Sequence, residues 1–389
     1  MVDDASGSLE DVVRPMSAPT ESDLRRAYCG KTVFVTGHSG FKGGWLTLWL
    51  ESLGAKVFGY ALAPEVGESF FAATDVASSC RHREADIRDR ERLQQALAET
   101  RPDFVFHLAA QSLVRKSYED PIATIETNMM GTANLLESIR RERIACSVVV
   151  VTSDKCYENR EWLFGYRENE PMGGHDVYSM SKGATELLVA SYRRSFFPAE
   201  RLADHGVVLA TARAGNVIGG GDWSKDRIVP DAIAALRKNL PIPVRNPESV
   251  RPWQHVLEPL GGYLLLGDRI AHGRADARAG WGEAWNFGPR IDDACTVRDL
   301  VEGLIDSWGS GRWENRHIAD APHEAGLLRL CIDKAHARLG WSPRWDAAEA
   351  IKRTVAWYRA HDRGADAKAL GALCHQQIRD YMGVKHDDA

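Results

Sequence analysis

Three polar residues with complementary acid–base chemistry follow a run of four valines. The stretch VVVVTSDKCY places Ser153, Asp154 and Lys155 just beyond an apolar segment that is typical of a buried strand. In an open parallel sheet, ligands bind beyond the carboxyl ends of the strands. A hydroxyl, a carboxyl and an amine at such an edge therefore indicate proton transfer to and from a bound substrate.

A tyrosine and a lysine lie four residues apart on the helix predicted next along the chain. Tyr178 and Lys182 belong to YSMSK, and this separation puts both side chains on one helix face. A nearby ammonium stabilises a phenolate, so the pair predicts a tyrosine with a lowered pKa that takes a proton from a sugar hydroxyl. Tyr381 and Lys385 repeat the spacing in a tail without predicted strands, and we interpret that second pair as a coincidence.

A glycine-rich segment, TGHSGFKGG, connects the first predicted strand to the first predicted helix. Glycines at this place let the backbone approach a pyrophosphate, and the helix N-terminus favours its negative charge. The segment predicts a dinucleotide site, with an ordinary tight turn as the alternative. The predicted cofactor contacts are Gly37, Ser39, Gly40, Phe41, Lys42, Gly43, Asp86, Ile87, Leu108, Ala109, Ala110, Tyr178 and Lys182.

The end of the second predicted strand bears on which dinucleotide binds. The acid that usually holds the adenosine ribose is missing there, since the strand ends in Tyr60, Ala61 and Leu62 and the nearest acid is Glu65. No arginine stands there to indicate a 2′-phosphate, so the pattern favours NAD over NADP. Asp86, after the next strand, either faces the adenine or caps a helix.

Strands and helices alternate up to about residue 215, and the strands are apolar throughout. This pattern predicts an α/β fold with a Rossmann-type, doubly wound parallel sheet that helices cover on both faces. Strands are expected at 31–36, 55–62, 103–110, 147–153 and 206–215. Helices are expected at 41–54, 89–100, 121–142 and 176–196, and again at 228–238, 296–308, 333–339 and 346–361.

The later part of the chain is rich in turns, which predicts a smaller C-terminal substrate-binding lobe. Composition indicates a flexible leader before the first strand and a polar tail, with one further helix, after the last lobe segment. The expected organisation is a leader over 1–29, an NAD-binding domain over 30–220 with a returning segment near 250–288, a substrate-binding lobe over 221–250 and 289–361, and a tail over 362–389.

Composition narrows the class of function. A net charge of −5 and a pI of about 6.2 argue against a basic nucleic-acid-binding surface. No apolar run approaches membrane-spanning length, and the first 29 residues lack a signal-peptide core. Seven scattered cysteines without C-x-x-C spacing indicate free thiols and a cytoplasmic protein. His317, Asp320, His323 and Glu324 lack metal-ligand spacing, so no metal is expected.

Five segments together resemble the extended short-chain dehydrogenase/reductase family. They are TGHSGFKGG, HLAAQSLV, VTSDKCY, YSMSK and GNVIGGGDW. Within that family, the chain over about residues 30–360 is similar to the nucleotide-sugar 4,6-dehydratases that act on CDP-glucose. NREWLFGYRENEPMGG and NPESVRPWQHVLEPL make this narrower resemblance more specific than the shared nucleotide motifs.

The resemblance implies a reaction in three stages on a bound hexose. Tyr178 takes the C4 hydroxyl proton while hydride passes to NAD; a base then removes the C5 proton as an acid protonates the departing C6 hydroxyl, and hydride returns to C6. The implied roles are acid for Asp154, base for Lys155 and hydrogen-bond partner of the C4 hydroxyl for Ser153. Related dTDP-glucose dehydratases carry Thr-Asp-Glu here.

The lysine is a departure from that Thr-Asp-Glu pattern. A lysine is ordinarily protonated at neutral pH, so a base at this position has to lose its proton through burial or neighbouring cations. The alternative is that Lys155 only pairs with Asp154, Glu158 or Glu161.

Several further roles also come from the resemblance. Asn216 resembles a contact to the substrate phosphate, and Arg251 resembles the arginine that grips the nucleotide diphosphate. Gln111, Arg227 and His255 are weaker substrate-binding candidates, and a structural role is the alternative for His255. The predicted helices 121–142 and 176–196 resemble those that pair in a homodimer, and a homotetramer is the other state considered.

Two other functions compete with dehydration. A nucleotide-sugar 4-epimerase needs only the tyrosine and the lysine, and has no use for the adjacent acid and base. An NAD-sensing scaffold on the same fold usually lacks the tyrosine or the lysine, which this chain keeps. The residues do not determine whether the nucleobase is cytosine, thymine or uracil.

Overall fold

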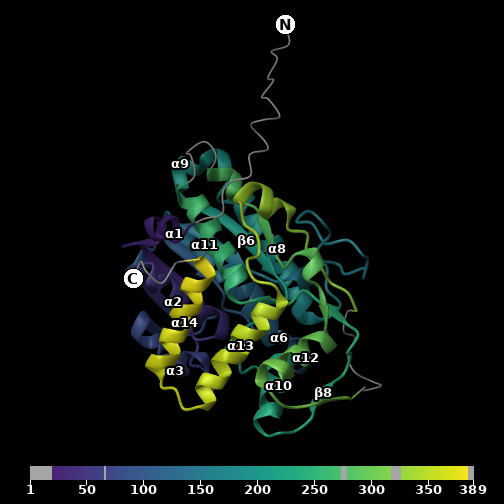
Figure 1. The fold of residues 1–389 in the computed structure, drawn as a ribbon. Helices are drawn as coiled ribbons and strands as arrows, with labels where there is room; N and C mark the ends of the chain where they lie inside the picture. The colour runs from purple at the N-terminus through teal and green to yellow at the C-terminus, as the bar shows by residue number, and fades with distance from the viewer. Residues whose placement is uncertain (1–19, 65–66, 273–277, 317–325, 384–389) are drawn as a thin grey trace.

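A seven-stranded sheet, parallel throughout, forms the centre of the fold. The computed structural model describes residues 20–64, 67–272, 278–316 and 326–383 (Figure 1). The strands are β1 (Thr32–Thr36), β2 (Lys56–Ala61), β3 (Arg81–Glu84), β4 (Phe104–His107), β5 (Ser147–Val151), β6 (Val208–Ala214) and β11 (Ala284–Phe287). Their order, β11-β6-β5-β4-β1-β2-β3, reverses between β1 and β4, which confirms the predicted doubly wound sheet.

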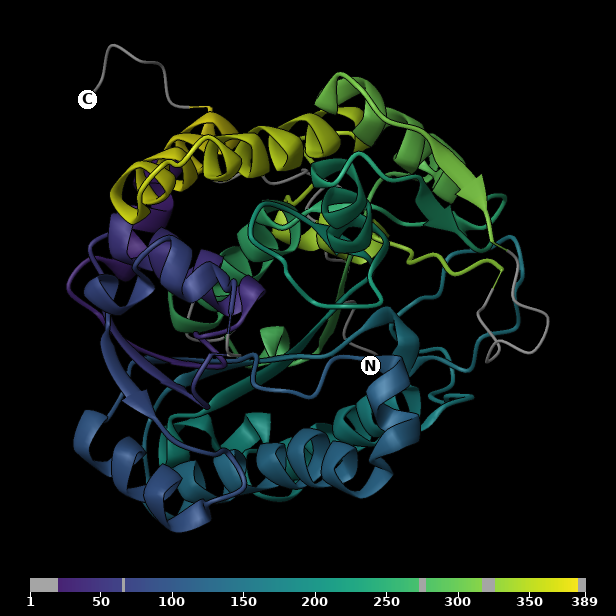
Figure 2. The same cartoon turned by 90° about the horizontal axis from the view of Figure 1, so that it is seen from below.

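Helices cover both faces of this sheet (Figure 2). One layer consists of α4 (Arg90–Thr100), α7 (Gly131–Arg141) and α8 (Val177–Ser195), and the other of α1 (Glu21–Tyr28), α2 (Phe41–Ser52) and α11 (Leu257–His272). Successive strand residues point to opposite faces, so Val33 and Val35 pack against the second layer while Phe34 packs against the first. Full burial of such a side chain stabilises the fold by about 1.5–3 kcal/mol.

The helix predicted over 121–142 is interrupted by one π-helical turn. Between α6 (Pro121–Ile125) and α7, residues Glu126–Met130 form this turn. Its Asn128 accepts a hydrogen bond from the backbone N–H of Gln111 at 2.8 Å and donates to the carbonyl of Gln111 at 3.0 Å. Single π-turns often occur at functional sites, and this one anchors the loop that follows β4.

The prediction of a flexible leader over 1–29 is wrong for residues 21–28, which form α1; residues 1–19 lie outside the described chain. Thr20 and Asp23 form a capping box at the start of this helix, with side-chain and backbone groups bonded in both directions. The helix buries Leu24, Ala27 and Tyr28, and the Tyr28 hydroxyl donates to the carbonyl of Leu264 on α11 at 2.6 Å. A buried apolar face and a long-range hydrogen bond therefore order this segment.

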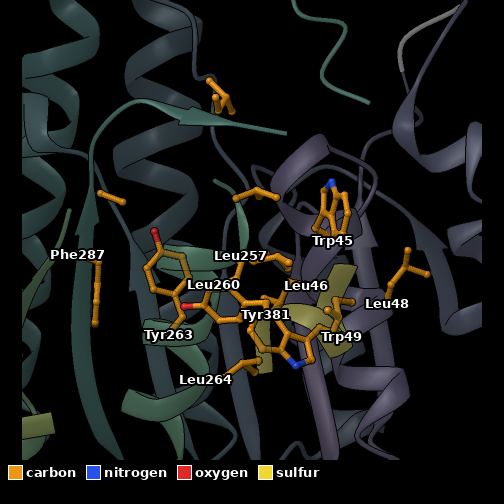
Figure 3. Close-up of a cluster of buried hydrophobic side chains, with 14 of the residues drawn as sticks. Trp45, Leu46, Leu48, Trp49, Leu257, Leu260, Tyr263, Leu264, Phe287 and Tyr381 are labelled. Atoms are coloured by element: carbon orange, nitrogen blue, oxygen red, sulfur yellow. The ribbon is translucent and has the colours of Figure 1, made fainter. Parts of the chain in front are cut away.

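The C-terminal part of the chain packs back onto the second helical layer. After α13 (Ala347–Asp362), the further helix expected in the tail is α14 (Ala367–Met382), which lies against α2. Its Tyr381 ring inserts beside Trp49, among the side chains of α2 and α11 (Figure 3). The hydroxyl donates to Glu258 on α11 at 2.9 Å, so Tyr381 has a packing role. Lys385 lies outside the described residues.

Glu258 gives the folding stability a specific pH dependence. The side chain is fully buried, and burial raises its pKa to about 7. The folded protein therefore holds a proton that the unfolded chain releases above about pH 4.3, so stability falls as pH rises from there towards 7. We expect the free energy of unfolding of the wild type, relative to Glu258→Gln, to fall by about 3 kcal/mol across this window.

Urea unfolding of both proteins at about pH 5 and about pH 8 measures this difference. Glu91→Gln, a change on the exposed start of α4, is the matched control and should track the wild type. Parallel pH profiles for wild type and Glu258→Gln would show that the carboxyl of Glu258 titrates alike in the folded and unfolded states.

Three two-stranded sheets and two helices lie beyond the large sheet. The paired strands are β7 (Val217–Ile218) with β10 (Gln254–His255), β8 (Ile242–Val244) with β13 (Trp313–Asn315), and β9 (Val250–Arg251) with β12 (Cys295–Thr296). The helices are α10 (Ile228–Arg237) and α12 (Val297–Trp308), and the helix expected at 333–339 is a π-helix over Ala335–Leu339. The strand β11 comes from the segment expected to return to the large sheet, and the predicted lobe boundaries stay a prediction.

Three other features bear on the class of protein. None of the helices in the described ranges is long and apolar enough to cross a membrane. All seven cysteines lie in those ranges and none is bonded to another. The described residues contain no cluster of metal ligands, and His317, Asp320, His323 and Glu324 fall outside them.

Candidate active site

One cleft of about 1250 Å³ opens along the carboxyl edge of the sheet, between the glycine turn and the smaller sheets. It exceeds the roughly 300–1,000 Å³ that a single drug-sized ligand occupies. The structure brings twenty of the predicted site residues to its wall: Gly37, Ser39, Gly40, Phe41, Lys42, Gly43, Asp86, Ile87, Leu108, Ala109, Ala110, Gln111, Ser153, Asp154, Lys155, Tyr178, Lys182, Asn216, Arg227 and Arg251.

The glycine turn between β1 and α2 has the shape that a pyrophosphate needs. Gly37 has a φ of +78°, and a Cβ on it would lie 2.7 Å from the backbone nitrogen of Ala109. A Cβ on Gly43 would lie 2.1 Å from the carbonyl oxygen of Gly37. Gly40 caps α2 without a side chain, so the first amides of this helix keep their N–H groups for an anion. These features fit a dinucleotide.

Replacing Gly43 by alanine tests this turn. The new Cβ has to displace the carbonyl of Gly37, so we expect about tenfold weaker NAD binding together with a lower midpoint of thermal unfolding. In the matched variant Gly40→Ala the Cβ meets only the carbonyl of Gly37, at 3.4 Å, so the unfolding midpoint should stay unchanged. Fluorescence titration with NAD and calorimetry measure both effects. Wild-type affinity and stability in Gly43→Ala would contradict the proposed close packing.

The part of the cleft next to β3 carries an ion pair that the sequence pattern did not indicate. Asp86 and Arg88 pair at 2.7 Å, and the Arg88 hydrogen bonds lower the pKa of Asp86. The alternative that Asp86 caps a helix is wrong, because Asp89 caps α4 by accepting from the backbone N–H of Arg92 at 3.1 Å. The backbone carbonyl of Asp86 accepts from the Tyr60 hydroxyl at 3.1 Å, which fixes β2 against this turn.

Asp154, the acid of the Ser-Asp-Lys triplet, is buried just beyond the C-terminal end of β5. Asp154 begins a short 3₁₀ turn over Asp154–Cys156, and only 3% of it is exposed. Ser153 donates to Asp154 Oδ1 at 2.9 Å, while Oδ2 has no hydrogen-bond partner among the described residues. Burial raises the pKa of Asp154, against the opposing charge of Lys155. The site thus favours a carboxyl group that keeps its proton, as a general acid requires.

Lys155 is half-buried in the same turn and lines the cleft. Its backbone N–H donates to Ser153 Oγ at 3.2 Å. Two of the carboxylates expected as alternative partners are engaged elsewhere: Glu158 pairs with Arg160 at 3.6 Å, and Glu161 accepts from the backbone N–H of Gly326 at 2.9 Å. The remaining expected partner is Asp154, whose pKa the charge of Lys155 lowers, so pairing with Asp154 stays the alternative to a role as base.

Helix α8 presents the tyrosine and the lysine to the same cleft. Asp176 caps the helix by accepting from the backbone N–H of Ser179 at 2.9 Å, which sets Tyr178 in the first turn. Lys182, one turn later, directs its Nζ to the carbonyl of Val151 at 3.5 Å. The end of β5 and the start of α8 thus meet within the cleft.

The structure contradicts the prediction that the pKa of Tyr178 is lowered. Burial raises the pKa of Tyr178 to about 12, because it penalises the phenolate more than the Ser153 hydroxyl stabilises it. Burial also lowers the pKa of Lys182 to about 8, against the charge of Glu186. The protein alone therefore holds the phenol protonated, and a further positive charge is needed to ionise it.

Arg227 and Arg251, two predicted substrate contacts, are held in place by hydrogen bonds to the loops around them. Arg227 pairs with Asp222 at 2.9 Å and donates to Ser112 Oγ at 3.1 Å. Arg251 donates to the carbonyls of Val250 and Gly326 at 3.1 and 3.2 Å.

Asn216 and Gln111 both line the cleft, and they are held there by different hydrogen bonds. The backbone carbonyl of Asn216 accepts from the N–H of Gln254 at 3.1 Å, which joins this residue to β10. The Gln111 side chain bonds to Leu113 in its own loop and to Thr124 on α6.

His255 is a correction to the predicted substrate contacts. It is fully buried, and it does not line the cleft. The ring packs edge-on against Trp45 and Trp345, with centroids 5.9 and 5.0 Å away. Burial lowers its pKa to about 3, so it remains a neutral core residue.

Sequence reasoning missed a lysine–tyrosine contact next to the predicted catalytic residues. Lys42 Nζ donates to the hydroxyl of Tyr263 on α11 at 3.3 Å. Burial and the charges of Lys182 and Arg227 lower the pKa of Lys42 to about 7. Lys42 was predicted as a cofactor contact, but α11 was not predicted as a helix, so nothing indicated this partner.

Comparisons with known proteins agree with the geometry. The family described as GDP-mannose 4,6 dehydratase matches residues 34–354. The chain is 49% identical over 356 residues to the CDP-glucose 4,6-dehydratase of Salmonella typhimurium, covering 91% of this chain and 97% of that protein. It is 31% identical to the dTDP-glucose 4,6-dehydratase of Streptomyces antibioticus, over 70% of this chain and 75% of the relative.

A solved structure shares the whole fold. The dTDP-glucose 4,6-dehydratase DesIV of Streptomyces venezuelae, determined with NAD bound, superimposes with a TM-score of 0.71 at 25% identity. The match covers 86% of this chain and 98% of the other.

Proposed function

The chain belongs to the GDP-mannose 4,6 dehydratase family, and on that premise we propose that it is an NAD-dependent lyase converting CDP-glucose to CDP-4-dehydro-6-deoxy-glucose. The observation that carries the choice of substrate is the 49% identity to a CDP-glucose 4,6-dehydratase over 91% of the chain. Products of this kind supply the synthesis of deoxysugars and surface polysaccharides.

The glycine turn and the loops after β3 and β4 hold the cofactor in this proposal. The free amides at the start of α2 receive the pyrophosphate, and Asp86 lies at the adenosine end of the cleft. When bound, NAD accepts hydride from C4 of the sugar and later returns it to C6.

Tyr178 removes the proton of the C4 hydroxyl as hydride leaves C4. Arg227 across the cleft lowers the pKa of this phenol in part, and bound NAD would bring the further positive charge that its ionisation needs. Ser153, whose hydroxyl bonds towards Tyr178, orients the C4 oxygen. The ketone formed at C4 then acidifies the proton at C5.

The triplet turn performs the elimination. Lys155 takes the C5 proton, and Asp154 gives its proton to the C6 hydroxyl, which leaves as water. The raised pKa of Asp154 supports the acid role, since burial favours the protonated form of a carboxyl. The adjacent positions of Asp154 and Lys155 let one short turn act on neighbouring carbons.

The nucleotide diphosphate lies on the side of the smaller sheets in this proposal. Arg251 and Asn216 are its expected contacts, and a guanidinium matches phosphate oxygens with paired donors. Arg227 is the third polar group on that wall, and Gln111 supports the loop beneath it.

A second copy of the chain is the proposed partner, in a cytoplasmic homodimer. Large apolar side chains are exposed on α6, the π-turn and α8, including Ile122 (63%), Met130 (47%) and Leu187 (62%). These neighbouring elements would be covered by the same surface of another copy, which is an isologous contact. Light scattering at micromolar concentration gives the mass, and a monomer there would exclude the dimer.

A panel of nucleotide sugars tests the proposed function. The protein with NAD is incubated separately with CDP-, dTDP- and UDP-glucose, and the masses of the products are measured by mass spectrometry. We expect CDP-glucose to lose one water first, giving a 4-keto-6-deoxy product. An unchanged mass with inverted C4 would favour an epimerase, and no change with any sugar would favour an NAD-sensing scaffold.

A further inference from the structure

A buried ion pair lies directly behind the catalytic turn. Glu186 on α8 and Arg213 on β6 pair at 2.8 Å, and each side chain is only 4% exposed. Taking two charges out of water is unfavourable, and such a pair adds little net stability compared with apolar packing. Stability alone is therefore a weak reason for this pair.

The pair holds both ends of the Ser-Asp-Lys triplet. On the N-terminal side, the Thr152 hydroxyl donates to Glu186 Oε1. On the C-terminal side, Arg213 Nη1 donates to the Tyr157 hydroxyl at 2.6 Å, with the guanidinium 4.9 Å from the centre of the ring. Thr152 directly precedes the triplet, and Tyr157 follows one residue after it, so the ion pair brackets residues 153–155.

The same pair is connected to the helix that carries the tyrosine and the lysine. Glu186 lies one turn after Lys182 and two turns after Tyr178 on α8. Its negative charge opposes the lowering of the Lys182 pKa by burial. A second hydroxyl, that of Thr211, donates to Glu186 Oε2 at 2.7 Å and fixes the carboxylate to β6.

We propose that the Glu186–Arg213 ion pair is a positioning element that keeps the Ser153–Asp154–Lys155 turn aligned with Tyr178 and Lys182. This inference rests on the proposed function and deepens it. Oxidation at C4 uses Tyr178 and Lys182 on α8, and elimination uses the triplet turn, so one bound sugar has to reach both. The ion pair is the buried contact that joins the turn to α8. Tyr157 completes the connection, donating onwards to Asn286 Oδ1 at 2.8 Å on β11.

Tyr157→Phe tests the proposal without leaving a buried charge unpaired. Removing Glu186 or Arg213 risks unfolding, because the surviving charge stays buried without its partner. Tyr157→Phe keeps the ring and the ion pair but releases the turn from Arg213. We expect elimination, which Asp154 and Lys155 perform, to slow about tenfold, the loss typical of a hydrogen bond to a charged group, and hydride removal from C4 to slow less.

The readout is the near-ultraviolet absorbance of reduced nicotinamide in a single turnover with CDP-glucose. The Tyr157→Phe protein should accumulate reduced cofactor transiently. The matched control is Tyr166→Phe, whose ring stacks on Tyr157 at 5.1 Å but whose hydroxyl bonds only to residues 159 and 160. Equal accumulation in both variants, or none in Tyr157→Phe, would overturn the proposal.

Hydrogen exchange of the backbone gives a readout that does not depend on the reaction. The amides of Cys156 and Tyr157 bond to the carbonyls of Ser153 and Asp154 within the turn. They should exchange about tenfold faster in Tyr157→Phe than in wild type or Tyr166→Phe. Faster exchange in a protein that does not dehydrate CDP-glucose would refute the proposed function alone, and unchanged exchange would refute the positioning role.

Discussion

Tyr178→Phe is expected to lower turnover of CDP-glucose by about 10³-fold, the order of effect that a positioned general base contributes. The phenol is the group on α8 that faces both Ser153 and the charges of the cleft, and phenylalanine keeps its ring while removing the proton acceptor. Without it the C4 hydroxyl keeps its proton, so hydride cannot leave C4. Neither reduced nicotinamide nor dehydrated sugar should form in a single turnover.

The control for this variant lies on the same helix. Tyr192→Phe removes a phenol about four turns further on, outside the cleft, and should turn over like the wild type. NAD affinity of both variants, measured by fluorescence, checks that the cleft is intact. Retention of a tenth or more of the wild-type rate by Tyr178→Phe would show that another group takes the C4 proton.

Asp154→Asn is expected to separate oxidation from elimination. Asparagine keeps the shape of the side chain but has no acidic proton for the C6 hydroxyl, so loss of water should slow by about 10²–10³-fold. Oxidation at C4 depends on Tyr178 and continues, so reduced nicotinamide should accumulate. Mass spectrometry and absorbance in a single turnover measure the two stages separately.

Lys155→Ala distinguishes the base from the acid. In heavy water, a protein with its base intact exchanges the C5 proton of the ketone, and the hydride returning to C4 releases labelled CDP-glucose. We therefore expect Asp154→Asn to introduce deuterium at C5 and Lys155→Ala to introduce none, although both accumulate reduced nicotinamide. C5 labelling by Lys155→Ala, or dehydration at the wild-type rate, would show that Lys155 is not the base.

The sheet was predictable because the apolar residue pattern of a buried strand identifies it in the sequence. Buried parallel strands are apolar throughout and alternate with helices, so β1, β4, β5 and β6 fell where the pattern placed them. The predicted strand over 147–153 ends two residues early, at Val151; the Thr152 N–H still donates to the carbonyl of Ala212 at 2.9 Å, and a 3₁₀ turn begins at Asp154.

Helix α11 could not be predicted in the same way. Its sequence, LEPLGGYLLLGDRIAH, contains one proline and three glycines and is buried from Leu257 to Gly267. The glycines are explained by contacts from distant segments. A Cβ on Gly262 would lie 2.3 Å from the Phe287 ring, and one on Gly267 would lie 2.4 Å from the Tyr28 hydroxyl. Such close approaches are set by tertiary packing, which local propensity does not contain.

In the candidate site, contacts within one motif were predictable and contacts between distant elements were not. Residues within one motif, such as Asp154 with Lys155 or Tyr178 with Lys182, were predictable because their spacing alone places them together. Partners from different elements were not, since Arg213 reaches Tyr157 across 56 residues of chain and Tyr263 reaches Lys42 across 221. The direction of the Tyr178 pKa also depended on burial, which spacing does not reveal.

Transfer of hydride within a single sugar is the central claim, and isotopic labelling tests it most directly. The protein with unlabelled NAD is given CDP-glucose that carries deuterium at C4, and the product is analysed by NMR. If the hydride leaves C4 and returns to C6 in one cleft, the product carries its deuterium in the C6 methyl group. Deuterium retained at C4, or a product without deuterium, would contradict this account.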